Sequence, residues 1–283
     1  MENTKLKKLM AKIESLPSMP AAGAKLLALL EEPEVSVHEI EEILRYDPGL
    51  TANVLKLANS AYFGIPARIG SVKQAIVLLG LKRLIQLIVA SCVGAVLHKS
   101  IPGYNMPSGD LWRQSIAVSI AAEALVKDKK NLDVEDYFTP ALLHDVGKLV
   151  LGGFVKEDLK AIENITNKGI PFVVAENMIL GTDHAEIGAK ILEAWSFPPD
   201  IVKAVRWHHD PEASDESNMQ IDVVHLANIL CQSNATGNGG SDQAVELSAA
   251  VIDRLGIQMR HFEKISGKVS RWVDELSEAL TFN

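Results

Sequence analysis

The sequence predicts an all-α protein, and three observations favour this fold class. Apolar residues recur at the 3.6-residue spacing of helices along the chain, and residues typical of helix N-terminal caps precede several of these stretches. Alternating apolar and polar residues bounded by hairpin turns, the pattern of strands, are nearly absent. With 283 residues, the chain is long enough for one large domain or two smaller lobes around a substantial core.

Helix starts are predicted where a side chain can accept a hydrogen bond from a free backbone amide and an acid or amide three residues later can reciprocate. Three pairs fit this pattern: Ser36 with Glu39, Ser71 with Gln74, and Asp183 with Glu186. Helix ends or restarts are predicted at Gly80, Gly103, Gly147 and the Pro198-Pro199 pair.

The most apolar segment, residues 84–97, is predicted to be a buried core helix. It has 14 residues and basic residues on both sides, whereas a helix that crosses a bilayer needs about 20 apolar residues. Residues 1–20 form a charged amphipathic stretch without the apolar run of a secretory signal. We therefore expect a soluble cytoplasmic protein that does not bind membranes.

Turn-rich stretches at residues 98–110 and 233–242 predict the organisation of the chain. They divide it into a helical N-terminal lobe (1–100), a central helical lobe (101–235) and a C-terminal helical extension (236–283).

Charge and cysteine content restrict the function. Twenty-eight Lys and Arg against 36 Asp and Glu give a net charge of −8, which disfavours a broad nucleic-acid surface. Two cysteines cannot build a thiolate cage for a metal, so any metal site must use imidazole and carboxylate ligands.

Five side chains of the central lobe could bind metal: His144, Asp145, His184, His208 and His209. Adjacent residues of a regular helix point about 100° apart, so a neighbouring pair shares a target only where a helix ends. Gly147 and Pro211 supply such ends after the two pairs, and His184 follows the predicted cap at Asp183. We therefore expect the three groups to lie at helix ends that could converge on one pocket.

Imidazole and carboxylate ligands suit a divalent Fe, Mn or Zn ion, and Asp145 could bridge two ions that activate water. The alternative is that these histidines are structural. In that interpretation His144 and His184 are satisfied core or capping residues, and His208 and His209 are solvated at a helix C-terminus. The residues alone leave both interpretations open.

In the N-terminal lobe, Asp47-Pro48 and Asn59-Ser60 could form a binding surface, but structural roles are favoured. Asp47 is typical of an N-cap with proline at the first helical position, and Asn59 or Ser60 can satisfy backbone groups where the helix over 50–57 ends. Tyr62 and Phe63 are interpreted as packing residues.

Several ordered motifs resemble the HDOD domain, a bacterial relative of the HD phosphohydrolases. Three of them lie in the first 84 residues: LPSMPAAGAKLLALL, RYDPGLTANVLKLANSAYFG and SVKQAIVLLGLKRL. LWRQS, ALLHDVGK, HAEIGAKILEAWSFP and AVRWHH extend the resemblance over about residues 10–235. The resemblance implies an HD-like helical bundle preceded by a helical N-terminal lobe.

The resemblance also indicates a partly degenerate metal site. The minimal HD ligand set is a histidine, the HD doublet and a later aspartate, but Gln114 and Asn228 stand at the two outer positions here. Neutral amide oxygens are weak ligands, which puts the usual hydrolysis in doubt. His184, His208 and His209 match positions where HD-GYP phosphodiesterases, which cleave cyclic di-GMP, bind an additional ion.

The function that these motifs imply is regulatory. Lys148 resembles the lysine of the HD-GYP motif HDxGK and is expected to contact phosphate, but the GYP-bearing sequence does not follow HHDPE. HDOD domains act as signalling modules, so we expect a bacterial regulatory protein that contacts signalling proteins, with a nucleotide or phosphate as a further candidate ligand. We assign no catalytic residue. The alternative is a metal-dependent phosphohydrolase or cyclic-dinucleotide phosphodiesterase.

Overall fold

The structure, a computed structural model, describes residues 36–234 and 248–257, together with a few separate helical residues nearer the two ends. Its helices follow one another as α3 (Val37–Arg45), α4 (Pro48–Ala58), α5 (Val72–Leu79), α6 (Leu81–Leu97), α7 (Asp110–Val126), α8 (Phe138–Leu143), α9 (Lys148–Thr166), α10 (Phe172–Leu180), α11 (His184–Ala194), α12 (Pro199–Trp207), α13 (Met219–Asn234) and α14 (Ala249–Leu255). Four short 3₁₀ turns, η1 (Ala61–Phe63), η2 (Pro102–Tyr104), η3 (Val134–Tyr137) and η4 (Pro211–Ala213), join them. Over these ranges the only β pairing is an isolated bridge between Ile101 and Met106, so the all-α prediction is confirmed.

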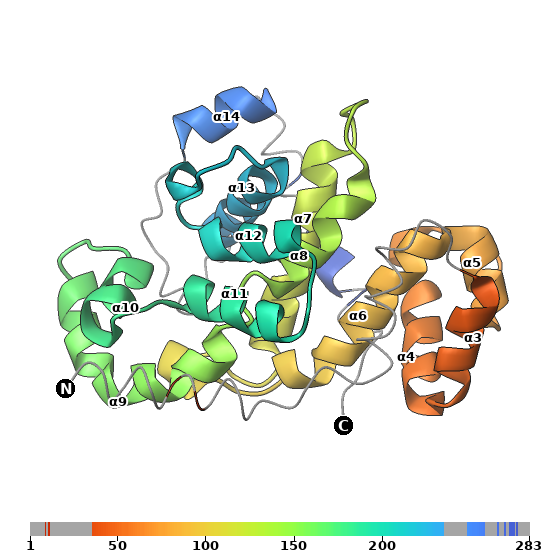
Figure 1. Ribbon diagram of the computed structural model, residues 1–283, viewed down its shortest axis with the longest axis horizontal. Coiled ribbons are helices and arrows are strands. Elements are labelled where there is room, and N and C mark those ends of the chain that lie inside the picture. The colour runs from red at the N-terminus through yellow and green to blue at the C-terminus, as the bar shows by residue number, and fades with distance from the viewer. Residues whose placement is uncertain are drawn as a thin grey trace.

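Helices α3, α4 and α5 form a helical lobe at one end of the molecule (Figure 1). Ser36 and Glu39 make the predicted capping box at the start of α3. Ser71 accepts from the backbone amide of Gln74 as predicted, but the Gln74 side chain accepts from Gly70 rather than from Ser71. The reciprocal half of that capping box is therefore displaced by one residue.

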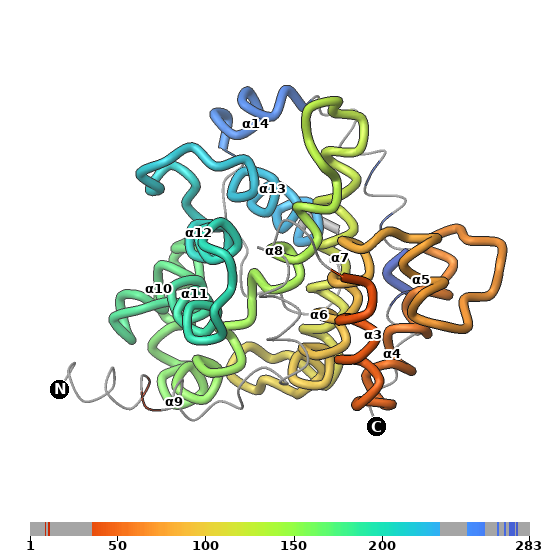
Figure 2. The backbone as a smooth tube through the Cα atoms, turned by 45° about the vertical axis from the view of Figure 1, so that its right-hand side comes forward, coloured from red at the N-terminus to blue at the C-terminus, as the bar shows by residue number. Residues whose placement is uncertain are grey.

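Helix α6 joins this lobe to the rest of the protein. It packs against α4 and α5 on one side and against α7 and α8 on the other (Figure 2). Gly80 separates α5 from α6 with a φ of 87°, a conformation that favours glycine. Residues 84–94 and Leu97 are buried, so the predicted core helix is confirmed and is longer by three residues at its start.

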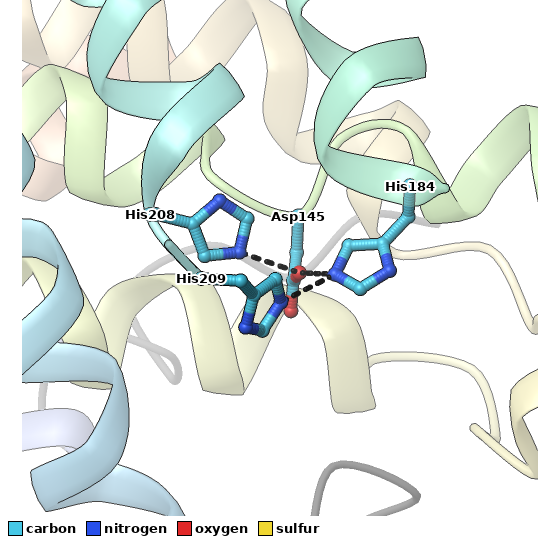
Figure 3. Close-up of side chains that lie close together, drawn as sticks. All are labelled: Asp145, His184, His208 and His209. Atoms are coloured by element: carbon cyan, nitrogen blue, oxygen red, sulfur yellow. Dashed lines mark hydrogen bonds and ion pairs between the residues drawn. The ribbon is translucent and has the colours of Figure 1, made fainter. Parts of the chain in front are cut away.

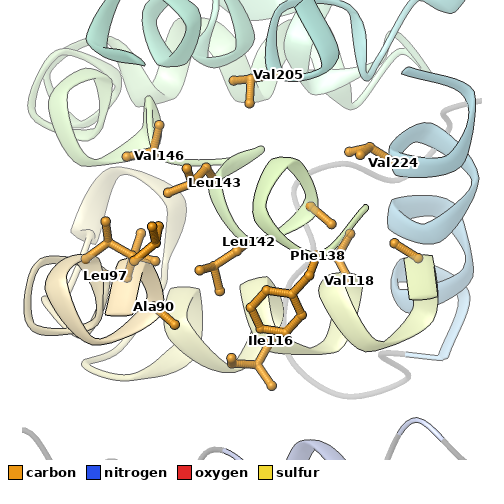
Figure 4. Packing of buried hydrophobic residues seen from close by; sticks show 14 of the residues in the cluster. Ala90, Leu97, Ile116, Val118, Phe138, Leu142, Leu143, Val146, Val205 and Val224 are labelled. Atoms are coloured by element: carbon orange, nitrogen blue, oxygen red, sulfur yellow. The ribbon is translucent and has the colours of Figure 1, made fainter. Parts of the chain in front are cut away.

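The central bundle is built around α7, α8, α12 and α13, with α9, α10 and α11 packed beside it (Figure 1). Its core contains Phe138, Leu142 and Leu143 of α8 and Ile116 of α7, all almost fully buried (Figure 4). Burying each such side chain stabilises the fold by about 1.5–3 kcal/mol. Because α8 lies within this core, its packing fixes the position of His144 and Asp145, which follow its last residue.

The predicted structural roles in the N-terminal lobe are borne out by hydrogen bonds. Asp47 caps α4 by accepting from the amide of Leu50 at 2.9 Å. The Asn59 amide donates to the carbonyls of Leu55 and Ile69 at 2.7 and 2.8 Å and accepts from the amide of Ile69 at 2.8 Å. Asn59 therefore ties the end of α4 to the segment before α5.

Tyr62 and Phe63 also pack as predicted, with their rings edge to face at 5.0 Å. The Tyr62 hydroxyl donates to the buried carboxylate of Glu123 in α7, which also pairs with Arg83 of α6. These contacts connect η1 to the central bundle.

Some predictions lie partly or wholly outside the described residues. These are the amphipathic N-terminus, the motif at residues 16–30, most of the 233–242 stretch and most of the C-terminal extension. The lobe boundaries near residues 100 and 235 stay predictions. Among the helices that are described, none has the length and apolar character needed to cross a membrane.

Candidate metal centre

The His144-Asp145 pair lies in a turn between two helices. Helix α8 ends at Leu143 and α9 begins at Lys148, as the prediction of a restart at Gly147 required. The Nδ1 of His144 donates to the carbonyl of Ala141 at 2.7 Å, which directs its Nε2 toward Asp145 Oδ2 at 3.2 Å. Both side chains have no exposed surface.

Gly147 allows the start of α11 to approach this turn. A Cβ atom added at Gly147 would lie 1.9 Å from the carbonyl oxygen of His184 and 2.6 Å from the amide of Gly188. Real Cβ contacts are never this short, so only glycine permits the two segments to meet. The close approach brings His184 to Asp145.

His184 is the first residue of α11, after the predicted N-cap Asp183. Asp183 accepts from the amide of Glu186 at 2.9 Å. The Glu186 side chain does not reciprocate, because it pairs with Arg206 and Lys190 instead. The His184 Nε2 lies 3.3 Å from Asp145 Oδ1.

His208 and His209 lie at the end of α12, where the regular helix stops at Trp207. The Nδ1 of His208 donates to the carbonyl of Val205 at 2.7 Å, and its Nε2 lies 3.8 Å from Asp145 Oδ1. The Nε2 of His209 lies 2.8 Å from the Nε2 of His184. The predicted convergence of three helix ends on one place is therefore what the structure shows.

Four of the five predicted donors form one cluster: Asp145, His184, His208 and His209 (Figure 3). Each offers one ligand atom, and these atoms all lie within 4.8 Å of one another. The first three are fully buried and His209 is partly exposed. His144, the fifth, faces the other oxygen of Asp145.

That other oxygen, Asp145 Oδ2, is surrounded by donors of the chain. Lys148 Nζ lies at 2.9 Å, and Gln114 Nε2 donates from 3.1 Å. Lys148 is only 2% exposed. Its expected contact with phosphate stays a prediction. The Asn228 side chain accepts from Gln232 of its own helix, and no hydrogen bond between Asn228 and the cluster is found among the described residues.

The charges of the cluster favour an ionised Asp145. Burial alone would raise the pKa of Asp145, but electrostatic interactions with His144 and Lys148 and hydrogen bonds from His144 and His184 hold it well below its ordinary value. Burial also lowers the pKa of His208, and the electrostatic interaction with His144 adds to this effect. Asp145 and His208 are therefore in the protonation states that metal ligands need.

The pKa of His184 shifts in the opposite direction to that of His208, because His184 faces two carboxylates. Burial alone would lower its pKa, but the charge of Glu176 and hydrogen bonds to Asp145 and Glu176 raise it to about 10. Its Nδ1 donates to Glu176 Oε2 at 2.7 Å.

The donor set fits a divalent ion. Three imidazole Nε2 atoms and one carboxylate oxygen converge, and no hydrogen-bond partner is found for His208 Nε2 in the described part of the chain. Zinc binds imidazole nitrogen at about 2.0 Å, so two nitrogens on one ion lie about 3 Å apart. The 2.8 Å between His184 and His209 fits that arrangement, and also a hydrogen bond between one donor and one acceptor ring.

Two residues of the site are absent from the sequence-based candidates: Glu176 and Tyr104. Glu176 is fully buried and accepts a hydrogen bond from the Tyr104 hydroxyl. A single acid within the largely apolar stretch FVVAENMIL is a signal that could have indicated Glu176. Nothing in the sequence pairs it with Tyr104, which is 72 residues away.

The order of these elements and their histidines can be compared with known proteins. A model of the HDOD domain matches residues 16–211, well over half of the chain and including every histidine of the cluster. The chain belongs to the HDOD domain family. The resemblance of the sequence motifs to HDOD domains is thus confirmed.

Solved structures of other proteins are similar to this chain in fold. An HDOD domain protein of unknown function from Geobacter sulfurreducens is 25% identical, with a TM-score of 0.77 and coverage of 98% of this chain and 96% of its own. A protein from Shewanella amazonensis SB2B, provisionally named a phosphohydrolase, is also 25% identical, with a TM-score of 0.75 and coverage of 96% and 98%.

A curated relative from Treponema pallidum (strain Nichols), named only as an uncharacterized protein, is 29% identical over 221 residues. This alignment covers 77% of the HDOD chain described here but 42% of the relative. The chain therefore spans less than half the length of that relative.

Proposed function

We propose that this HDOD protein is a regulatory module that acts through contacts with signalling proteins, and that its central bundle holds one divalent ion as a structural or sensory element. On this proposal the protein does not turn over substrate efficiently. The family membership supports the regulatory role, since HDOD domains resemble hydrolases of the HD superfamily but act as signalling modules.

The observation that carries the proposal is the different environment of the two oxygens of Asp145. Oδ2 is engaged by Lys148, Gln114 and His144, which leaves it little capacity to bridge a second ion. Oδ1 faces the Nε2 atoms of His184 and His208, at 3.3 and 3.8 Å. A two-ion hydrolytic site would need both oxygens, so the geometry supports a site for a single ion.

Burial of the ligands is a second argument against efficient hydrolysis. Catalytic metal sites keep an open position for water and substrate, whereas structural sites are closed. Here Asp145, His184 and His208 have no exposed surface, and only His209 is partly exposed. For Lys148 to steady a phosphate, its ammonium would have to leave Asp145.

The alternative function is a metal-dependent phosphohydrolase, including a cyclic-dinucleotide phosphodiesterase. The surviving donors and Lys148 favour it, as does the provisional name of the Shewanella amazonensis relative. In this case Asp145 would bridge two ions and Lys148 would stabilise charge on phosphate. Iron, manganese and zinc are all compatible with the donors.

Hydrolysis assays distinguish the two functions. Protein loaded with Mn²⁺ or Fe²⁺ is incubated with cyclic di-GMP and with a phosphomonoester, beside a His144→Ala variant that controls for contaminating enzymes. We expect the same background rate for both proteins. Turnover by the wild type that disappears in His144→Ala would reject the regulatory proposal and support the hydrolase.

A further inference from the structure

Glu176 occupies an unusual place for a carboxylate. It lies on α10, has no exposed surface, and makes three hydrogen bonds. Its Oε2 accepts from both the Nδ1 and the backbone amide of His184, at 2.7 and 3.2 Å. Its Oε1 accepts from the hydroxyl of Tyr104, which is 2% exposed.

Burying a carboxylate is costly unless its oxygens are paired and hydrogen-bonded. A purely structural role would be satisfied by the bond to the His184 amide at the start of α11. The bond to Nδ1 has a further effect, since it fixes the ring so that Nε2 faces Asp145 Oδ1 at 3.3 Å and His209 Nε2 at 2.8 Å.

The partner of His184 differs from that of the other buried histidine in the cluster. His208 holds its ring through the backbone carbonyl of Val205, a neutral acceptor. His184 uses a carboxylate, which makes an imidazole a better electron donor to an ion bound at its other nitrogen. Such carboxylate partners fix both the tautomer and the ring orientation of metal-binding histidines.

We propose that Glu176 and Tyr104 are positioning residues for the ion: Glu176 orients His184 as a ligand, and Tyr104 orients Glu176. This inference rests on the proposed single-ion site and assigns a role to two residues outside the HD ligand pattern. It also extends the site into α10 and η2, two elements that carry none of its ligands.

The test measures metal affinity in matched variants of the full chain. Glu176→Gln keeps the size and one acceptor but removes the charge, and Tyr104→Phe keeps the ring and removes only the hydroxyl. Glu186→Gln is the matched control, because Glu186 lies on α11 and pairs with Arg206 and Lys190 rather than with the cluster. Dissociation constants for Co²⁺ are measured by chelator competition, and the visible absorption of bound Co²⁺ reports its ligand geometry.

We expect Glu176→Gln to weaken Co²⁺ binding by about 10–100-fold and to change the Co²⁺ absorption spectrum. Tyr104→Phe should weaken binding by a smaller factor, and Glu186→Gln should leave affinity and spectrum unchanged. Thermal melting of the metal-free proteins shows whether each variant folds. A purely structural role would lower that melting temperature without changing the affinity of the folded protein.

The outcomes separate this inference from the proposed function. If the wild type binds Co²⁺ and both Glu176→Gln and Tyr104→Phe bind it equally well with the same spectrum, the positioning role is wrong and the single-ion site stands. If the wild type binds no Co²⁺, the single-ion site and the positioning role are both wrong. If Glu176→Gln does not fold, the Co²⁺ affinity and spectrum of Tyr104→Phe alone test the positioning role.

Discussion

At the scale of the residue, Asp145 has two oxygens with different partners. One oxygen accepts from an ammonium and an amide of the chain, and the other faces imidazole nitrogens. The hydrogen bonds through the Nδ1 atoms of His184 and His208 leave their Nε2 atoms directed toward the second oxygen. The Nδ1 atoms of both histidines thus have the carboxylate or carbonyl acceptors that metal-binding histidines usually have.

Gly147 provides a direct test of how the cluster is assembled. Gly147→Ala would place a Cβ against the backbone of His184, and neither segment can move without disturbing Asp145 or His184. We expect a loss of about 3 kcal/mol or more in the free energy of unfolding, at the upper end for overpacked cores. Metal affinity should fall as well. Urea denaturation and Co²⁺ titration measure the two effects.

Gly49→Ala is the control for that substitution. A Cβ at Gly49, in the first turn of α4, has its nearest contact at 3.6 Å, an ordinary van der Waals distance. Its stability should change by less than about 1 kcal/mol, since alanine also favours the helix. Equal stability of Gly147→Ala and Gly49→Ala would contradict the close approach of the two segments.

Cys231 of α13 gives a second prediction at this scale. Its side chain is half-buried, burial raises the pKa of its thiol to about 12, and only the thiolate reacts with alkylating agents. At pH 8 its alkylation by iodoacetamide should therefore be at least about 100-fold slower in the native protein than in guanidinium. Peptide mass spectrometry measures the rate at this residue. Similar rates in the two states would show that the thiol is accessible.

At the scale of the element, the helices begin and end where local side chains satisfy backbone groups. Asn59 is the clearest case, because it makes three hydrogen bonds to the backbone at Leu55 and Ile69. We expect Asn59→Ala to lower the free energy of unfolding by about 1–3 kcal/mol. Its metal affinity should match that of the wild type, because α4 carries no ligand.

The neighbouring Ser60→Ala is the matched control for Asn59→Ala. No hydrogen-bond partner is found for the Ser60 hydroxyl among the described residues, so its removal should change stability by less than about 0.5 kcal/mol. Thermal or urea unfolding compares the two variants. A structural role for Asn59 would be refuted if both variants were as stable as the wild type.

Local signals explain which elements could be predicted. The caps at Ser36, Asp47 and Asp183 depend on residues three positions away, so the sequence alone indicates them. The reciprocal hydrogen bonds predicted for two capping boxes were wrong. In the first, the Glu186 side chain pairs with Arg206, 20 residues along the chain, so a tertiary contact replaces the local one. In the second, the Gln74 side chain accepts from the backbone amide of Gly70, one residue before the predicted partner Ser71.

The same reasoning applies to the candidate site. Histidine and aspartate at helix ends suggested the convergence of His144, Asp145, His184, His208 and His209. The contacts of Glu176 and Tyr104, and of Lys148 and Gln114 with Asp145 Oδ2, depend on how distant helices pack. Spacing along the chain does not determine such packing, so sequence reasoning could not separate the two oxygens of Asp145.

At the scale of the whole molecule, one helix connects the N-terminal helical lobe to the bundle that carries the cluster. Helix α6 packs on both, and the buried Glu123 adds polar contacts to Arg83 and Tyr62 at the same place. The lobe and the cluster therefore belong to one packed structure. An ion held in the bundle would therefore stabilise the packed structure to which the lobe belongs.

The central claim is that the cluster holds one ion, and elemental analysis tests it most directly. Protein is prepared in medium supplemented with iron and manganese, and metal is counted per chain for the wild type, the isosteric Asp145→Asn and the partly exposed His209→Ala. We predict about one ion per wild-type chain, and a marked loss in both variants with the helical content retained. Two ions per wild-type chain, or none, would contradict the account.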